Sequence, residues 1–437
     1  MGKQGKVKGT IPYALGMVSY NMEYMLIAYL SYAMTNSFGI SAITAGSIFL
    51  VSRIFDGISD IIAGIVIDRT NSKFGKARVY DILHIPLWIC VVLLFSVPKI
   101  GMVGKLIWVF AFYNILQSGI ATFMNVSEPL RLQRSFKEDG RMKVMRATSI
   151  ATMVFSFVAG FTLPILIKRF GAMPHGWTII SFIFAIPSAI FGITRFILLP
   201  ELPELQRNTE AKEKISLSMS LKALFQNKYA LLYGGVMICW AMYNTLYNGS
   251  TTYYFQFVYG DISAQSITSI PTLLTIPFIA FIPIIADKCG KTNTVRIGLA
   301  MAAVSQLAKL LMPTNVIWIA VMHGIALCGI MVLSFMKPLL TIDCMEYGKL
   351  KTGNSVEAAY STVNSLADKL GLGLGSFALG AILEFGKYDG TLAVQPQSAV
   401  FTIKMLYTVI PAALMIIALC FFVFYNVEKV LAKAKQK

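Results

Sequence analysis

Residues 45–67 read AGSIFLVSRIFDGISDIIAGIVI, an apolar run that contains three charged side chains. A run of about 20 apolar residues is long enough to cross a membrane as a helix. A charged side chain at the bilayer centre costs about 2.5–3.5 kcal/mol on insertion scales, so such residues are rare and tend to mark functional paths. The stretch therefore predicts a membrane-spanning helix with a polar site.

Asp56 and Asp60 are four residues apart, so both carboxylates lie on one face of the expected helix. Arg53 lies on the same stripe, three residues before Asp56. One interpretation is a buried ion pair that only fixes helix packing. The other, which we favour, is a cation or proton site that faces a water-filled path. In that site Asp60 would be the main coupling group, Asp56 an auxiliary ligand and Arg53 their charge partner. A coupling sodium ion would be held by the two carboxylates.

The composition is that of a protein with many membrane spans. Of its 437 residues, 56% are hydrophobic and 14% are charged, whereas a soluble protein has about 25% charged residues. We therefore expect an all-α integral membrane protein with twelve transmembrane helices. Their expected ranges are 11–33, 45–67, 80–97, 106–126, 147–167, 178–199, 230–257, 266–286, 297–312, 316–336, 360–385 and 400–424.

The net charge of +17 is placed as in a membrane protein rather than a nucleic-acid binder. Lys and Arg gather in alternate loops, whereas residues 35–44 and 259–264 contain none. By the positive-inside rule, this pattern places both termini in the cytoplasm. We expect the basic loops to attract membrane lipid and no nucleic acid. The clearest basic clusters are Arg69, Lys73, Lys76 and Arg78, then Arg131, Arg134, Lys137, Arg141, Lys143 and Arg146, then Lys288, Lys291 and Arg296.

The chain is expected to consist of two similar six-helix halves. Its longest polar interval, 201–228, would be a cytoplasmic linker between an N-terminal half, 1–200, and a C-terminal half, 229–437. The pairs Asp68-Arg69 and Asp287-Lys288 each open a basic loop at corresponding points of the two halves. Paired halves of this kind place a substrate site between them near the membrane midplane.

The second expected span and its loop contain the motif Asp56-x3-Asp60-x3-Gly64-x3-Asp68-Arg69-Thr70. Gly64 would let another helix approach closely. The cytoplasmic end would be closed by a gate, a salt-bridged loop formed by Asp68, Arg69, Lys73 and Arg78. The motif resembles the cytoplasmic loop signature of the major facilitator superfamily. More narrowly, it resembles the glycoside–pentoside–hexuronide:cation symporters, to which melibiose carriers belong. The resemblance implies that the two acids bind the coupling Na⁺ or H⁺.

A second match lies in the eleventh expected span, which contains Asp368-Lys369-Leu-Gly371-Leu-Gly373-Leu-Gly375. Its glycines would thin one helix face so that neighbouring helices can pack or slide. The resemblance matches Lys369 to a membrane lysine of the family. Its ammonium could face the acids of the second span and replace the coupling cation when the site is empty. A lysine that snorkels to the interface is the alternative.

The expected sugar contacts in the first half depart from those of melibiose carriers. Asn125 stands where many members have an acid, and Pro129 where they have tryptophan. Asn21 is the nearest equivalent of a lysine–aspartate pair in the first span. Arg146 matches a family arginine near the sugar, although an ordinary loop charge explains it almost as well. The missing acids put a melibiose-like sugar contact in doubt.

The seventh expected span is rich in aromatic residues, and Trp240, Tyr243 and Tyr247 share a face. Aromatic rings suit the apolar faces of sugars, so these three are candidate sugar contacts; an interfacial aromatic belt is the alternative. Lys337, near the end of the tenth expected span, would mark the cytoplasmic interface or else meet an anionic substrate such as a hexuronate.

The sequence contains no nucleotide-binding loop, nucleophile elbow or metalloprotease motif, so we expect no enzyme and no cofactor beyond the coupling ion. We expect a secondary active transporter of the bacterial plasma membrane, the inner membrane. It would take up a sugar or glycoside with Na⁺ or H⁺ by alternating access. Two alternatives remain open: a major facilitator exporter of amphipathic or lipid-like solutes, and a membrane protein that transports nothing.

Overall fold

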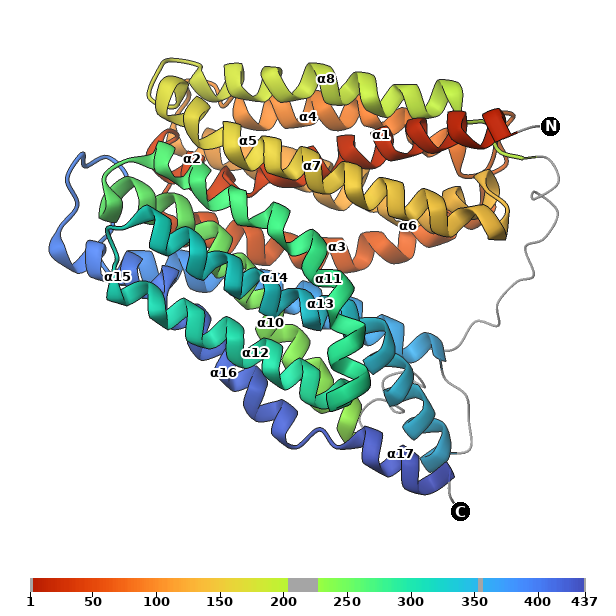
Figure 1. The fold of residues 1–437 in the computed structure, drawn as a ribbon. Helices are drawn as coiled ribbons and strands as arrows, with labels where there is room; N and C mark the ends of the chain where they lie inside the picture. The colour runs from red at the N-terminus through yellow and green to blue at the C-terminus, as the bar shows by residue number, and fades with distance from the viewer. Residues whose placement is uncertain (1–2, 203–226, 353–356, 436–437) are drawn as a thin grey trace. The chain divides into compact units, whose positions relative to one another are not determined.

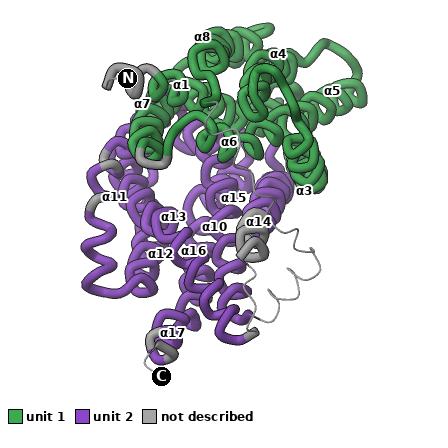
Figure 2. Tube along the Cα trace, turned by 90° about the vertical axis from the view of Figure 1, so that its right-hand side faces the viewer, with its two compact units in different colours: residues 1–211, 389–393 green, residues 212–388, 394–437 purple. Residues whose placement is uncertain are grey.

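The computed structural model describes residues 3–202, 227–352 and 357–435, and all regular structure in these ranges is helical. This confirms the expected all-α class. The chain divides into two compact units, shown in Figure 2: unit 1 contains residues 1–211 and 389–393, and unit 2 contains 212–388 and 394–437. The expected boundaries at 200 and 229 stay a prediction, because most of the expected linker lies outside the described residues.

In unit 1, α1 packs against α7 and α8, α4 packs against α8, and α3 packs against α6. Figure 1 shows α1, α4 and α8 as neighbouring ribbons. The elements are α1 (Lys3–Ile27), α2 (Leu30–Asn36), α3 (Ala42–Arg69), η1 (Arg78–Leu83), α4 (His84–Phe95), α5 (Met102–Asn114), η2 (Ile115–Ala121), α6 (Thr122–Ser135), α7 (Glu138–Phe170) and α8 (Gly176–Leu198).

In unit 2, α10 packs against α14 and α16, and α12 packs against α13 and α16. The elements are α10 (Lys228–Tyr254), η4 (Phe255–Tyr259), η5 (Ile262–Ser269), α11 (Ile270–Cys289), α12 (Lys291–Ala308), η6 (Lys309–Leu311), α13 (Val316–Thr352), α14 (Glu357–Phe385), α15 (Gln397–Tyr407), α16 (Val409–Val423) and α17 (Val427–Lys435).

Nine helices in the described part of the chain are long and apolar enough to cross a membrane. Each of the twelve expected ranges falls mainly on helical structure. The three that are not among the nine lie on α1, α3 and α10. These helices carry polar residues inside their apolar runs: α1 contains Glu23, α3 contains the acids of the motif, and α10 is rich in Tyr, Asn and Thr. The expected site residues therefore lie largely on the helices that least resemble plain membrane spans.

The glycines of α14 bring it close to α10, as expected. A Cβ atom on Gly371 would lie 2.7 Å from the carbonyl oxygen of Ile238, and one on Gly375 would lie 3.1 Å from Cα of Met242. Only glycine allows this separation. Around Gly64 on α3, no described atom of its own unit lies within 4 Å of the position that its Cβ would take, so the expected close approach of another helix stays a prediction.

Candidate functional site

Two charged side chains of α3, Arg53 and Asp56, form an ion pair. Arg53 Nη1 lies 2.7 Å from Asp56 Oδ2, and the side chains are 23% and 6% exposed. Ser118 Oγ donates a hydrogen bond of 2.5 Å to the other carboxylate oxygen, Oδ1. Arg53 Nη2 also donates to Tyr113 Oη at 3.4 Å. Asp60 is half-buried one turn further along α3. The structure thus brings Arg53 and Asp56 together and adds Ser118, which no sequence pattern indicated.

A π-helical turn, η2, explains how Ser118 comes to face Asp56. It lies between α5 and α6 in one continuous helical run. Gln117 Nε2, on the same turn, donates to Glu23 Oε1 at 2.7 Å. Isolated π turns redirect side chains and are frequent at functional sites. The same turn therefore donates hydrogen bonds to Asp56 of α3 and to Glu23 of α1, and both acids are buried.

A second charged network in unit 1 lies apart from this pair. Asp81 accepts from Arg131 at 2.8 Å and from Arg195 at 2.6 Å, and Arg195 also contacts Glu128 at 2.8 Å. Arg131 is fully buried. Removing one partner of a buried ion pair typically costs about 3–5 kcal/mol, because it leaves a charge uncompensated. We infer from this burial that the network holds η1, α6 and α8 together.

The expected sugar residues of unit 1 have different environments. Asn21 Oδ1 accepts a hydrogen bond from Ser156 Oγ at 2.7 Å, which joins α1 to α7. Asn125 is exposed and lines a cavity of about 20 Å³ together with Glu128 and other residues of α1, α4 and α8. Arg146 is exposed on α7. Their contact with a sugar stays a prediction.

In unit 2, Tyr243 and Tyr247 are almost fully buried, at 1% and 5% exposure. Tyr243 Oη accepts a hydrogen bond from Gln306, and Tyr247 Oη lies 2.8 Å from His323 Nδ1 and 3.1 Å from Tyr407 Oη. Both rings are enclosed by protein in this structure. Their contact with a sugar would require this cluster to open and stays a prediction.

Lys309 lies among the same aromatic side chains, and no sequence pattern indicated it. Its side chain is fully buried, and its Nζ donates to Tyr247 Oη at 3.2 Å. Nζ also lies 4.3 Å and 4.6 Å from the ring centroids of Tyr247 and Tyr407. Lys309 forms no ion pair with a carboxylate among the described residues. Two cation–π contacts therefore take the place of a counter-ion.

Trp240 occupies a different position from the two tyrosines of its predicted group. Its ring lies 5.3 Å from Lys337 Nζ, and that ammonium lies 2.6 Å from Asp368 Oδ2. Trp240 Nε1 and Asp368 Oδ1 are buried, and neither has a hydrogen-bond partner among the described residues. Lys369, the next residue on α14, belongs to unit 2, whereas the acids of α3 belong to unit 1, so their expected approach stays a prediction.

Of the four residues of the expected cytoplasmic gate, Arg78 contacts the end of α8 and Glu201, and the gate itself stays a prediction. Arg78 Nε donates to the carbonyl oxygen of Phe196 at 2.8 Å, and the Arg78 amide donates to Glu201 Oε1 at 2.7 Å. The carboxylate of Glu201 also accepts from the amides of residues 76 and 77. Asp68, Arg69 and Lys73 are exposed. The loop is therefore fastened to the end of α8 by Arg78 and Glu201.

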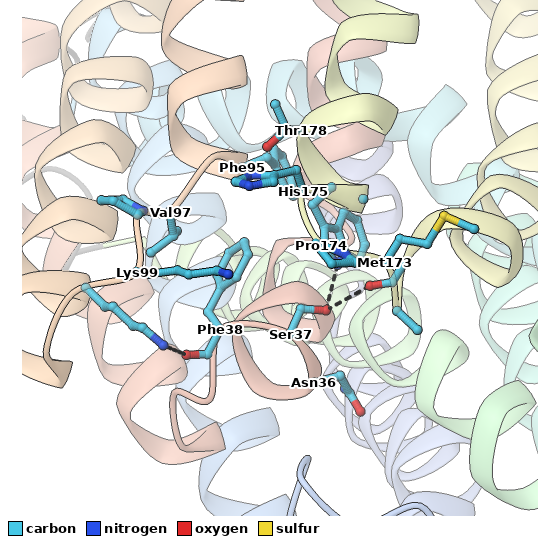
Figure 3. A pocket seen from close by; sticks show the side chains of 16 residues that line it. Asn36, Ser37, Phe38, Phe95, Val97, Lys99, Met173, Pro174, His175 and Thr178 are labelled. Atoms are coloured by element: carbon cyan, nitrogen blue, oxygen red, sulfur yellow. Dashed lines mark hydrogen bonds between the residues drawn. The ribbon is translucent and has the colours of Figure 1, made fainter.

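A cavity of about 390 Å³ in unit 1 contains none of the predicted site residues (Figure 3). It is bounded by the end of α2, the α4–α5 connection and the start of α8. Lys105 Nζ, on its wall, donates to the carbonyl oxygen of Phe38 at 2.8 Å, and Trp177 Nε1 donates to Ser37 Oγ at 2.8 Å. These contacts tie the surrounding loops together.

Comparison with known proteins agrees with this arrangement. Residues 12–429 match the family described as MFS/sugar transport protein. The isoprimeverose transporter of Lactiplantibacillus pentosus is 28% identical, over 97% of this chain and 90% of that protein. The putative glycoside/cation symporter YagG of Escherichia coli (strain K12) is 25% identical, over 93% and 89%.

The solved structure of the nucleoside transporter NupG is similar in fold. It has a TM-score of 0.69 at 16% identity and covers 96% of this chain and 99% of its own. The sequence matches extend over almost the whole chain and the fold agrees with them. The chain therefore belongs to the MFS/sugar transport protein family and, within the major facilitator superfamily, to the glycoside–pentoside–hexuronide:cation symporters.

Proposed function

We propose that this membrane transporter takes up a neutral or acidic glycoside together with Na⁺ or H⁺ by alternating access. Twelve transmembrane helices with both termini in the cytoplasm are part of the proposal. The names of its relatives, an isoprimeverose transporter and a putative glycoside/cation symporter, support sugar as the solute and a cation as its partner.

The observation that carries the proposal is the Arg53–Asp56 pair on α3. A buried carboxylate in an apolar helix needs a positive partner, and in this structure Arg53 supplies it. A coupling cation would neutralise the Asp56 and Asp60 carboxylates and release Arg53 from Asp56. Cation binding would thus exchange one positive charge for another without leaving a bare carboxylate in the membrane.

Nearby oxygens suit either coupling ion. Ser118 Oγ contacts Asp56, and Ser52 Oγ, four residues before Asp56, is buried without a hydrogen-bond partner. Carboxylate and hydroxyl oxygens are ligands that hard metal cations prefer. A sodium ion would draw on this set, whereas a proton would require only the carboxylates. We keep Asp60 as the main coupling group and Asp56 as the auxiliary one.

The test is ion flux into de-energised vesicles that contain the protein. Isoprimeverose, a neutral xyloside and a hexuronate are added in turn while external pH and Na⁺ are recorded. Sugar-dependent alkalinisation or loss of external Na⁺ supports symport and identifies the ion. Absence of cation movement with every sugar, in protein shown to be folded and inserted, contradicts the proposal.

A further inference from the structure

Three polar residues of unit 2 meet where three of its helices lie together. Lys337 on α13 pairs with Asp368 on α14 at 2.6 Å and lies 5.3 Å from the ring of Trp240 on α10. The close packing of α14 on α10 at Gly371 brings the helices of Asp368 and Trp240 together. We call Lys337, Asp368 and Trp240 the unit 2 polar triad.

All three residues lie at a similar distance from one end of their helices. Trp240 is 12 residues from the start of α10, Asp368 is 11 residues from the start of α14, and Lys337 is 15 residues from the end of α13. At 1.5 Å per residue these separations are roughly 16–22 Å, and α13, with 37 residues, is longer than a hydrocarbon thickness of about 30 Å requires. The interface position that the sequence favoured for Lys337 stays a prediction.

The pair is partly accessible: the Lys337 and Asp368 side chains are 27% and 29% exposed. Charged groups that face hydrocarbon are costly, so intramembrane charges face the protein interior or a water-filled cavity. We therefore expect the exposed part of this pair to face water or a polar path rather than lipid.

The triad has hydrogen-bonding capacity that the protein leaves unused. Asp368 Oδ1 and Trp240 Nε1 are both buried without a partner. An unsatisfied buried polar group costs about 1–3 kcal/mol. Both atoms are enclosed in this structure, so each would gain a hydrogen bond when the triad opens to a ligand. Asp368 Oδ1 accepts a hydrogen bond and the Trp240 indole donates one. A sugar hydroxyl can do both, and a carboxylate can only accept.

The charges of the triad decide between two kinds of sugar. Lys337 and Asp368 neutralise each other, so Lys337 is not a free cation for an acidic substrate. A hexuronate carboxylate would be repelled by Asp368 or would have to displace it. We infer that the unit 2 polar triad contacts the solute and selects neutral, hydroxyl-rich glycosides over uronates. This inference rests on the proposed function and narrows its substrate class.

The test compares a neutral and an acidic probe in the full-length protein. Equilibrium binding and vesicle uptake are measured with isoprimeverose and with p-nitrophenyl glucuronide. The variants are Asp368→Asn, Lys337→Gln and Trp240→Phe. Glu384→Gln is the matched control, because Glu384 is an exposed acid on the same helix. Thermal unfolding and gel filtration show whether each variant is folded.

We expect the wild type to prefer isoprimeverose. Asp368→Asn should shift the neutral-to-acidic binding ratio at least tenfold toward the glucuronide, because it frees Lys337. Lys337→Gln should not produce this shift, and Trp240→Phe should weaken isoprimeverose binding several-fold. A wild type that prefers the glucuronide, or a ratio left unchanged by Asp368→Asn, overturns the inference.

The outcomes also separate this inference from the proposed function. If the wild type couples isoprimeverose to a cation but the Asp368→Asn ratio stays the same, only the triad is rejected. If the ratio shifts but no cation moves with sugar, the triad is retained and symport is rejected. If the wild type binds neither probe, the inference fails together with its premise.

Discussion

Asp56 and Asp60 lie on one helix, yet their surroundings predict different effects of the same substitution. Asp56→Asn removes the carboxylate partner of Arg53 and should lower the unfolding free energy by up to about 3 kcal/mol, because a part-buried charge loses its partner. Asp60→Asn should abolish cation-driven sugar accumulation while expression stays normal. Uptake assays and thermal unfolding in detergent measure the two effects separately.

Full accumulation by Asp60→Asn would contradict its role as the main coupling group. A loss of stability in Asp60→Asn as large as that in Asp56→Asn would show that both acids hold the helix together. The exposed Glu384→Gln serves as the charge-matched control.

Lys309 allows a test of whether its charge or its volume stabilises unit 2. Lys309→Met keeps a long apolar side chain and removes a fully buried ammonium that lacks a carboxylate partner. Such a replacement is often neutral or stabilising. Lys309→Ala also leaves a cavity, and large-to-small core changes typically cost about 2–5 kcal/mol. Thermal unfolding should therefore show that the Met variant melts at or above the wild-type temperature and the Ala variant below it.

If both Lys309 variants lose stability equally, the cation–π contacts with Tyr247 and Tyr407 outweigh the cost of burying the charge. That result would contradict the prediction. It would also show that the aromatic cluster depends on the ammonium itself.

At the scale of elements, the π turn η2 makes a prediction about Ser118. Ser118→Ala removes the hydrogen bond to Asp56 Oδ1. A hydrogen bond to a charged group is worth about 1.5–3 kcal/mol, so apparent affinity for the coupling cation should fall roughly tenfold or more. Cation titration of sugar binding measures this change. Ser376→Ala is the matched control, since Ser376 Oγ donates a hydrogen bond to a carbonyl oxygen of its own helix, α14.

An unchanged cation affinity in Ser118→Ala would mean that Asp56 is positioned by Arg53 alone. Circular dichroism should show unchanged helicity in both serine variants, so that a weaker affinity is not attributed to unfolding.

The spacing of residues along the sequence predicted one contact of the site well, because both partners lie on the same helix. Arg53 and Asp56 are three residues apart, and they form the ion pair that this spacing allows. Ser118 could not be predicted, because its direction depends on a π turn that has no clear sequence signal. Lys337–Asp368 and the Lys309 cluster each join different helices, so they depend on tertiary packing. Gly64 shows the limit of a motif: it is expected to contact another helix, and within the described part of its own unit no helix lies against it.

At the scale of the whole molecule, the chain is a multi-pass transporter of the bacterial cell membrane. The Arg53–Asp56 pair of unit 1 and the Lys337–Asp368 pair of unit 2 are both part-exposed carboxylate–cation pairs within the helices. In unit 1 the pair lies within α3, whereas in unit 2 it joins α13 and α14. Because one pair lies within a single helix and the other joins two helices, the two pairs suit different roles. We propose cation exchange for the first and solute selection for the second.

Symport also makes a quantitative prediction for the intact protein. If the coupling cation raises sugar affinity by some factor, sugar must raise cation affinity by the same factor, because the two equilibria are linked. Isothermal titration of isoprimeverose with and without cation, and of cation with and without isoprimeverose, should give equal ratios. Asp60→Asn should bring both ratios to about one while the protein still binds isoprimeverose. A wild-type ratio of one for both ligands would contradict coupling through this site and would favour uptake of sugar alone.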